Sequence, residues 1–188
     1  MFGFQRIGDL AWAAAELALA GQALDDPRSA GWLDTGTLFA LSHLEYEERG
    51  DTLDVYDTSA LAFADLVRAY RASPDGPDDV SEPLLLDGLR AVLESAAEHA
   101  GRDPFRVGVS QTDFDTVPRA LGLVAVARMY RELTRDDTFM NLEADQLDWV
   151  LGANPWGVSF VVGIGTTFPR CVHHMTGNLA TDRTGDPI

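Results

Sequence analysis

A short segment near the end of the chain concentrates side chains that suit recognition of a polar ligand. His173 and His174 lie next to each other, two positions after the only cysteine, Cys171, and a tryptophan, Trp156, precedes them. Imidazole donates or accepts hydrogen bonds and has a flat face, which suits sugar hydroxyls and rings. A tryptophan ring can stack on the C–H face of a pyranose. For the two histidines, the alternative is a structural role in which they satisfy loop carbonyls.

A zinc site is a second chemistry for the same segment, because thiolates and imidazoles are zinc ligands. Cys171, His173 and His174 match no paired Cys-x-x-Cys or His-x-x-x-His spacing, however, and no fourth ligand lies nearby in the sequence. No loop has a calcium-binding pattern. The glycines at 163 and 165 lack the third glycine of a dinucleotide site and are expected to allow a tight turn. We therefore expect neither a metal nor a cofactor.

Charge and composition narrow the classes of partner. The 188 residues include 30 acidic and 14 basic side chains, all of the basic ones arginine, for a net charge of −16. This charge argues against nucleic acid and against anionic membrane surfaces, both of which attract cationic proteins. No segment reaches the ~20 apolar residues needed to span a bilayer, and the first residues do not resemble a secretory signal. A neutral ligand such as a sugar fits better.

The elements that must position these side chains are helices. Apolar residues recur at helical spacing over six segments, with glycine, proline and aspartate between them. Gly152 and Pro155 follow the last segment in the order typical of a helix end. A short strand is the single exception we expect, at 159–162, and 73–83 is expected to be a solvated linker. The predicted helices are 10–22, with Asp9 as its cap, 32–46, 58–72, 84–100, 116–133 and 136–151.

The segment from Gln146 to His174 resembles the histidine-loop signature of family 9 glycoside hydrolases. It combines a helix end at Gly152-Ala153-Asn154-Pro155, the run S-F-V-V-G-x-G at 159–165, and the histidine pair. The W-A-A-A-E-L string at 12–17 also resembles a helix of this family. The resemblance implies an all-α fold, here an incomplete part of an (α/α)6 barrel built from antiparallel helical hairpins. On this view residues 1–188 are a partial catalytic domain.

The resemblance also implies a function: hydrolysis of β-1,4-glucosidic bonds with inversion, by a cellulase of the endoglucanase type acting on β-glucan or its oligosaccharides. The family's base lies in a D-A-G-D-type motif and its acid in an N-E motif. The chain contains neither string, so its catalytic residues are unknown and the chain alone is expected to be inactive. The alternative is a truncated, non-catalytic helical module that binds glycan or protein.

The resemblance assigns substrate binding to His173 and His174. Trp156 is a further candidate, although packing of the loop onto the barrel is the favoured role for it. Two positions depart from the family: Met175 replaces a sugar-binding arginine, and 110–115 lacks the usual tryptophan. A partial barrel would also expose apolar helix faces and could self-associate through them. The family is usually secreted, but the chain itself leaves localisation unknown.

Overall fold

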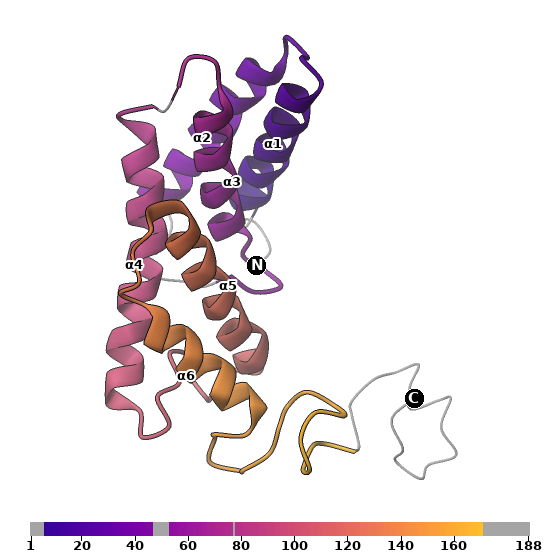
Figure 1. The fold of residues 1–188 in the computed structure, drawn as a ribbon, viewed down its shortest axis with the longest axis vertical. Helices are drawn as coiled ribbons and strands as arrows, with labels where there is room; N and C mark the ends of the chain where they lie inside the picture. Colours follow the sequence, from indigo (N-terminus) through magenta and orange to yellow (C-terminus); the bar gives the residue numbers. More distant parts are fainter. Residues whose placement is uncertain (1–5, 47–52, 77, 171–188) are drawn as a thin grey trace, which may run out of the picture.

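The fold is all-α in this computed structural model, which describes residues 6–46, 53–76 and 78–170. The described residues form antiparallel helical hairpins, as predicted, and contain no strand (Figure 1). The helices are α1 (Arg6–Ala23), α2 (Ser29–Tyr46), α3 (Ser59–Ala72), α4 (Ser81–Arg102), α5 (Thr116–Thr134) and α6 (Met140–Leu151).

The helices form two layers. Each odd-numbered helix packs on the even-numbered helix that follows it, which gives three hairpins. Within one layer α1 packs on α3 and α3 on α5, and within the other α2 packs on α4 and α4 on α6. The middle helix α3 is therefore covered on most sides, and its apolar residues, among them Phe63, Leu66 and Val67, are buried. The shared core lies around α3 and between the layers.

One contact shows how closely the connections pack on the helices. The backbone carbonyl of Leu53, in the α2–α3 connection, lies against Gly122 of α5. A Cβ atom at position 122 would come within 1.8 Å of that oxygen. A side chain is therefore excluded at this point, which fixes the connection on α5.

Several predicted boundaries were wrong. The first helix begins at Arg6 instead of residue 10, so Asp9 lies in its first turn and accepts a hydrogen bond from Thr58 Oγ1 at 2.7 Å. The fourth begins at Ser81, inside the predicted linker, because a proline at position 83 is tolerated in a first turn. The last begins at Met140 instead of residue 136. The predicted strand at 159–162 is a series of bends and turns.

The tryptophans of the helices differ in burial. Trp149 is buried, whereas Trp12 and Trp32 are half-buried. Trp12 Nε1 donates a hydrogen bond to Asp65 at 3.0 Å, which joins α1 to α3 and explains why this ring lies at the edge of the core. Of the helical histidines, His43 is buried against the Phe63 ring and His99 is exposed.

The connections at the two ends of the bundle differ in length. Short connections join α1 to α2 and α5 to α6 at the upper ends of these helices in Figure 1. The segment 53–58 precedes α3, and the segments 103–115 and 152–170 follow α4 and α6, all at the lower ends of these helices. The long connections therefore lie at one end of the bundle. The segment that leads to the histidine pair begins at this end.

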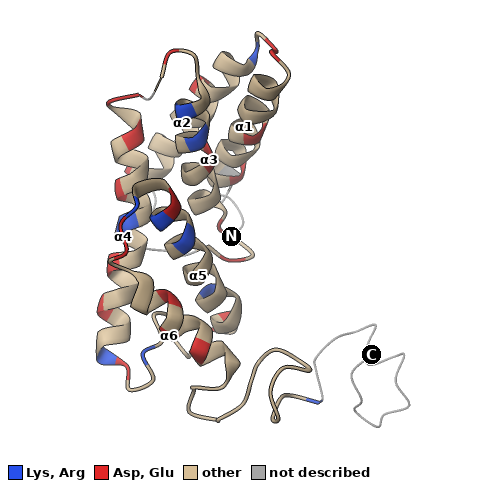
Figure 2. Cartoon of the chain, viewed as in Figure 1, with Lys and Arg blue, Asp and Glu red and all other residues tan. Residues whose placement is uncertain are grey.

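Acidic side chains occur on every helix, whereas arginines lie mainly on α3, α4 and α5 (Figure 2). Among the described helices, none is both long and apolar enough to cross a membrane.

Candidate functional site

The loop after α6 is held by one buried side chain, Asn154. Its Nδ2 donates hydrogen bonds to the carbonyls of Trp149 at 2.7 Å and Val158 at 2.8 Å. Its Oδ1 accepts from the backbone N–H groups of Trp156 at 3.1 Å and Val158 at 3.4 Å. Because the amide satisfies groups on both sides of the turn, it fixes the direction in which the chain leaves α6.

Three aromatic rings fasten the same loop to the helix. The Trp156 ring meets Trp149 edge-on, with centroids 6.4 Å apart, and meets Phe160 at 5.8 Å. Trp149 and Phe160 are 5.3 Å apart. Trp156 nevertheless keeps 60% of its surface exposed. The ring thus packs the loop onto α6, as favoured from the sequence, and also presents an open surface to solvent.

The turn that leads toward the histidines depends on two glycines. Gly163 and Gly165 have φ values of 82° and 80°, which L-residues rarely adopt. Ser159 N donates to the Thr167 carbonyl at 2.9 Å and closes the base of this turn. Phe160 N donates to the Val150 carbonyl at 2.9 Å, which ties the turn to α6. The expectation of a tight glycine turn is confirmed.

The α4–α5 loop lies at the same end and is organised by Asp103. Its carboxylate accepts hydrogen bonds from the backbone N–H of Phe105 at 2.8 Å and from Gln111 Nε2 at 2.6 Å. Arg106, with φ 58°, donates from Nε to Asp145 of α6 at 2.7 Å, and this hydrogen bond raises the pKa of the guanidinium. The loop is thereby attached to the helix that carries the histidine loop.

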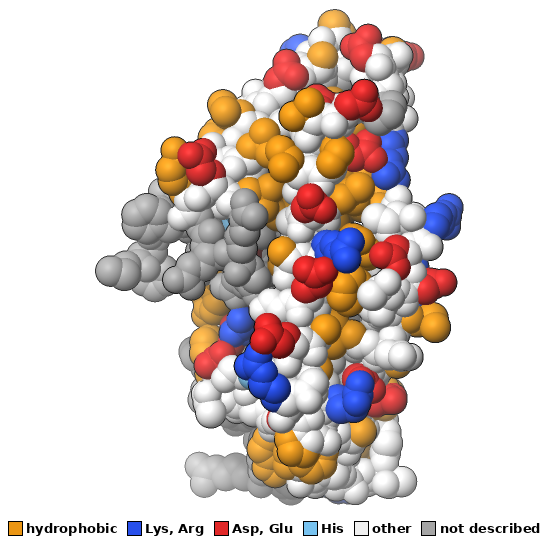
Figure 3. Space-filling view, turned by 90° about the vertical axis from the view of Figure 1, so that its left-hand side faces the viewer, with side chains coloured by type: hydrophobic (Ala, Val, Ile, Leu, Met, Phe, Trp, Pro, Cys, Tyr) orange, Lys and Arg blue, Asp and Glu red, His pale blue; other side chains and the backbone are white. Residues whose placement is uncertain are grey.

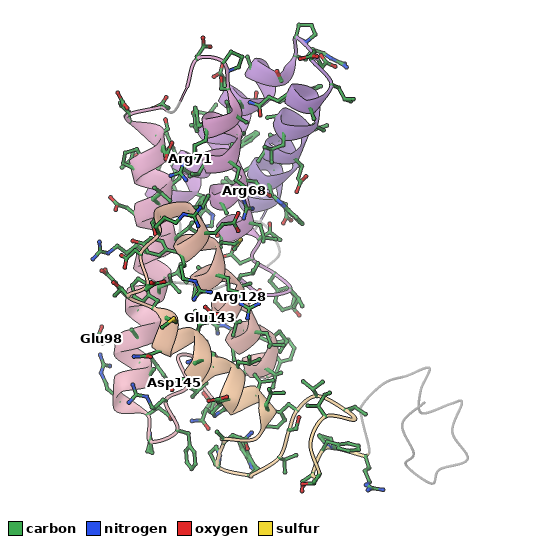
Figure 4. All side chains as sticks on the ribbon, in the orientation of Figure 1. Arg68, Arg71, Glu98, Arg128, Glu143 and Asp145 are labelled. Carbon is green, nitrogen blue, oxygen red and sulfur yellow. The ribbon has the colours of Figure 1, made fainter. Side chains whose placement is uncertain are left out.

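A buried carboxylate joins the two helices that frame the site. Glu143 of α6 accepts from Arg128 Nε at 2.6 Å and from Arg131 Nη1 at 2.8 Å, both on α5 (Figure 4). Two charge-assisted bonds to a buried carboxylate fix the α5–α6 hairpin more firmly than an exposed pair would. The hairpin therefore gives the loop at its end a rigid base.

Exposed aromatic rings at this end include a pair that the sequence did not single out. Phe114, in the α4–α5 loop, is 86% exposed and meets Tyr56 of the α2–α3 connection edge-on at 6.3 Å. Phe114 stands in the segment noted above only for its missing tryptophan. Phe114 lies between two aspartates in a polar loop, where an aromatic ring is not expected to be buried. This feature of the sequence could have indicated an exposed ring.

The predicted sugar-binding residues His173 and His174 lie outside the part of the chain that the structure describes. Cys171 also lies outside it, so the zinc alternative stays untested as well. Among the described residues there is no cluster of three or more histidine, cysteine or acidic side chains that could hold a metal. What the structure brings together is the anchored loop leading to the histidines, Trp156 on it, and the Tyr56–Phe114 pair at the same end of the bundle.

The comparison with protein families agrees with this arrangement. The model of glycosyl hydrolase family 9 matches residues 6–186, nearly the whole chain. The chain belongs to this family. This match confirms the family 9 resemblance that the segment from Gln146 to His174 indicated, and it extends over all six helices.

Solved family 9 structures share the fold. The structure of AaCel9A in complex with cellobiose-like isofagomine has a TM-score of 0.66 and 20% identity, over 93% of this chain and 32% of that one. The endoglucanase J30 has a TM-score of 0.54 and 17% identity, over 89% of this chain and 40% of its own. This likeness shows that the three hairpins correspond to part of the (α/α)6 barrel.

Curated relatives match over shorter segments. Endoglucanase 21 of Oryza sativa subsp. japonica is 53% identical over 38 residues, and endoglucanase 10 of Arabidopsis thaliana is 49% identical over 39. These segments cover 20% and 21% of this chain and 7% of each plant protein. The chain thus matches only a small part of these relatives and about a third of the solved AaCel9A chain.

Proposed function

We propose that this chain supplies the sugar-binding part of a glycoside hydrolase of the cellulase and endoglucanase type, acting on β-1,4-glucan. The observation that carries the proposal is the family 9 match over residues 6–186. The anchored loop after α6 supports it, because Asn154 and the ring of Trp149 fix the segment that leads to His173 and His174. These histidines would hydrogen-bond the sugar beside the scissile bond.

Aromatic rings would supply the rest of the contact. Trp156 is open on its solvent side, and Phe114 with Tyr56 forms an exposed pair at the same end of the bundle. Such rings stack on the C–H faces of pyranoses, which gives affinity for a neutral ligand without demanding charge. This fits the acidic surface, which does not favour anionic ligands.

The proposal includes that residues 1–188 are a partial catalytic domain without turnover of its own. Inversion requires an acid and a base whose carboxyl groups stand roughly 6.5–9.5 Å apart across the bond. Three acidic side chains at the loop-bearing end make structural hydrogen bonds or ion pairs. Asp54 and Asp57 accept from backbone N–H groups at 2.6 and 2.8 Å before α3, and Asp113 pairs with Arg119 at 2.9 Å. In an intact enzyme, the acid and base would come from other segments.

Calorimetric titration of the purified chain with cellopentaose tests sugar binding. We expect saturable binding that weakens about fivefold or more in His174→Ala and in Phe114→Ala, in line with the loss of a central contact. His99→Ala, on the exposed face of α4, is the matched control and should bind like the wild type. Absence of binding in the folded wild type would refute the proposed site.

Release of reducing ends from carboxymethylcellulose tests the second part. We expect none from the chain alone. Turnover that survives purification and disappears on mutation of an acidic residue of this chain would show that the chain holds a catalytic carboxylate.

A further inference from the structure

The Tyr56–Phe114 ring pair is too exposed to be held in place by its own packing. Phe114 is 86% exposed and Tyr56 is 44% exposed, and their centroids are 6.3 Å apart. A side chain that buries little apolar surface gains little free energy from packing. The two rings also belong to different connections, 53–58 and 103–115. The arrangement of the pair must therefore be set by contacts that hold these two connections together.

Arg119, near the start of α5, reaches both connections. Its Nη1 donates to the Asp113 carboxylate at 2.9 Å, and its Nε lies 3.9 Å from the Asp54 carboxylate. Asp113 directly precedes Phe114 in the sequence, and Asp54 lies two residues before Tyr56. One guanidinium group thus pairs with a carboxylate from each of the segments that carry the rings.

The Asp54 carboxylate links this ion pair to the backbone that carries Tyr56. Its Oδ1 accepts hydrogen bonds from the backbone N–H of Tyr56 at 2.6 Å and of Asp57 at 2.9 Å. Only 7% of the Asp54 side chain is exposed, and a nearly buried carboxylate needs positive charge or hydrogen-bond donors around it. Arg119 supplies positive charge beside this carboxylate. The pairing therefore favours one position of the Tyr56 turn against α5.

The face of α5 that carries Arg119 contacts the two segments at neighbouring points as well. Gly122, three residues further along the helix, lies against the backbone carbonyl of Leu53. Thr116, three residues earlier, donates from Oγ1 to the carbonyl of Asp113 at 2.6 Å. Positions three apart share a face of a helix. Of these three positions, Arg119 is the one that pairs with both segments, and it lies between the other two contacts.

We propose that Arg119 positions the Tyr56–Phe114 ring pair for sugar binding. It does so by pairing with Asp54 and Asp113, which holds the two connections together. Without the guanidinium, the two carboxylates lose their shared cation and repel each other, so the segments separate and the rings lose contact. A ring pair that is already in place spares the sugar the cost of ordering it. The inference rests on the proposed sugar site for its effect on affinity, whereas the ring contact can be measured without sugar.

The contact between the two rings tests the positioning role directly. In the wild type without sugar, we expect a nuclear Overhauser effect between the ring protons of Tyr56 and Phe114, because the rings meet edge-on. Arg119→Gln should lose this signal. Arg119→Lys should keep part of it, because lysine retains the charge but has one nitrogen where arginine uses two. A signal in Arg119→Gln as strong as in the wild type would overturn the proposal.

Arg90→Gln is the matched control for the loss of one arginine. Basic and acidic side chains lie next to one another at several places on the face shown in Figure 3. Arg90 makes an exposed pair of this ordinary kind with Glu94, within α4, and such pairs contribute little to stability. The control should keep the ring signal, and circular dichroism will show whether each variant remains helical. Loss of the signal in Arg90→Gln as well would reveal a general effect of charge and contradict the proposal.

Calorimetric titration with cellopentaose measures the consequence for binding. Arg119→Gln should weaken binding about threefold or more, because the sugar must then order the rings itself, and Arg90→Gln should bind like the wild type. In a Phe114→Ala background, Arg119→Gln should change the dissociation constant by less than about twofold, since the ring pair is already lost. Equal losses in both backgrounds would contradict action through the rings. If the wild type binds no cellopentaose, the proposed sugar site fails, and the ring signal still decides whether Arg119 holds the two connections.

Discussion

Gln146, fully buried in α6, accepts a hydrogen bond at 2.6 Å from the backbone N–H of Gly108 in the α4–α5 loop. Its Nε2 donates to the Arg106 carbonyl at 3.0 Å and to the Leu142 carbonyl at 3.2 Å. Gln146 of α6 thus satisfies buried backbone groups of the α4–α5 loop, which carries Phe114. The same helix leads into the segment that precedes the histidine pair. The two candidate binding elements are coupled through it.

Replacement of Gln146 by leucine should therefore destabilise the fold. The change leaves the Gly108 N–H and the Arg106 carbonyl buried without this partner, which costs about 1–3 kcal/mol of unfolding free energy. Urea denaturation followed by circular dichroism measures it. Asn141→Leu, at an exposed position of the same helix, should change the unfolding free energy by less than about 0.5 kcal/mol. Equal losses of unfolding free energy in the two variants would show that the hydrogen bonds of Gln146 do not stabilise the fold.

Asn154→Asp tests the anchor of the histidine loop. The substitution keeps the oxygen that accepts from Trp156 N but replaces the amide donor with an oxygen facing the carbonyls of Trp149 and Val158. We expect a loss of about 2–4 kcal/mol at neutral pH. Burial and the two carbonyls favour the protonated acid, so the loss should shrink as the pH falls. A loss independent of pH would contradict this geometry.

Two glycine-to-alanine substitutions should act in opposite directions. Gly122→Ala places a Cβ atom 1.8 Å from the Leu53 carbonyl oxygen and should destabilise by about 1–3 kcal/mol. Gly31→Ala, on an open face of α2 with nothing within 4 Å, should stabilise by up to about 1 kcal/mol. Thermal unfolding of both variants measures the pair. A neutral Gly122→Ala would mean that the α2–α3 connection is not held against α5.

Asp78 should contribute to the pH dependence of stability. Hydrogen bonds from the backbone N–H groups of Ser81 at 2.6 Å and Val80 at 2.7 Å lower the pKa of this carboxyl below its usual value. A lowered folded-state pKa gives stabilisation that is present above the unfolded-state pKa and is lost as the pH falls through the folded-state pKa. The destabilisation caused by Asp78→Ala should therefore be larger at pH 7 than at pH 2. Asp79→Ala, at an exposed neighbouring position, is the control. If the unfolding free energies of the two variants depend on pH in the same way, the stabilising role of the Asp78 carboxylate is contradicted.

The sequence predicted the helices well because their apolar spacing and their end signals agree. Gly152, with φ 132°, ends α6 where the glycine and proline signals placed it. The errors arose where the signals conflict. The proline at 83 favours a linker, although it lies in the first turn of α4. The apolar run after Ser159 favours a strand, although Gly163 and Gly165 turn the chain.

The candidate site was harder to predict, because its geometry depends on contacts between distant segments. The histidine loop could be found from its contiguous motif. The Tyr56–Phe114 pair joins two connections that are far apart in the sequence, and Gln146 acts on a loop 38 residues away. No local pattern reports such contacts.

Nuclear magnetic resonance of the tryptophan indole N–H groups during titration with cellotetraose tests the central claim most directly. The four tryptophans include one at the proposed site, Trp156, and three in or near the core. The account predicts a saturable shift of the Trp156 signal, with little change for Trp12 and Trp32, which lie on α1 and α2, neither of which packs on α6. An unchanged Trp156 signal, or a shift confined to Trp12 or Trp32, would contradict a sugar site at this end of the bundle.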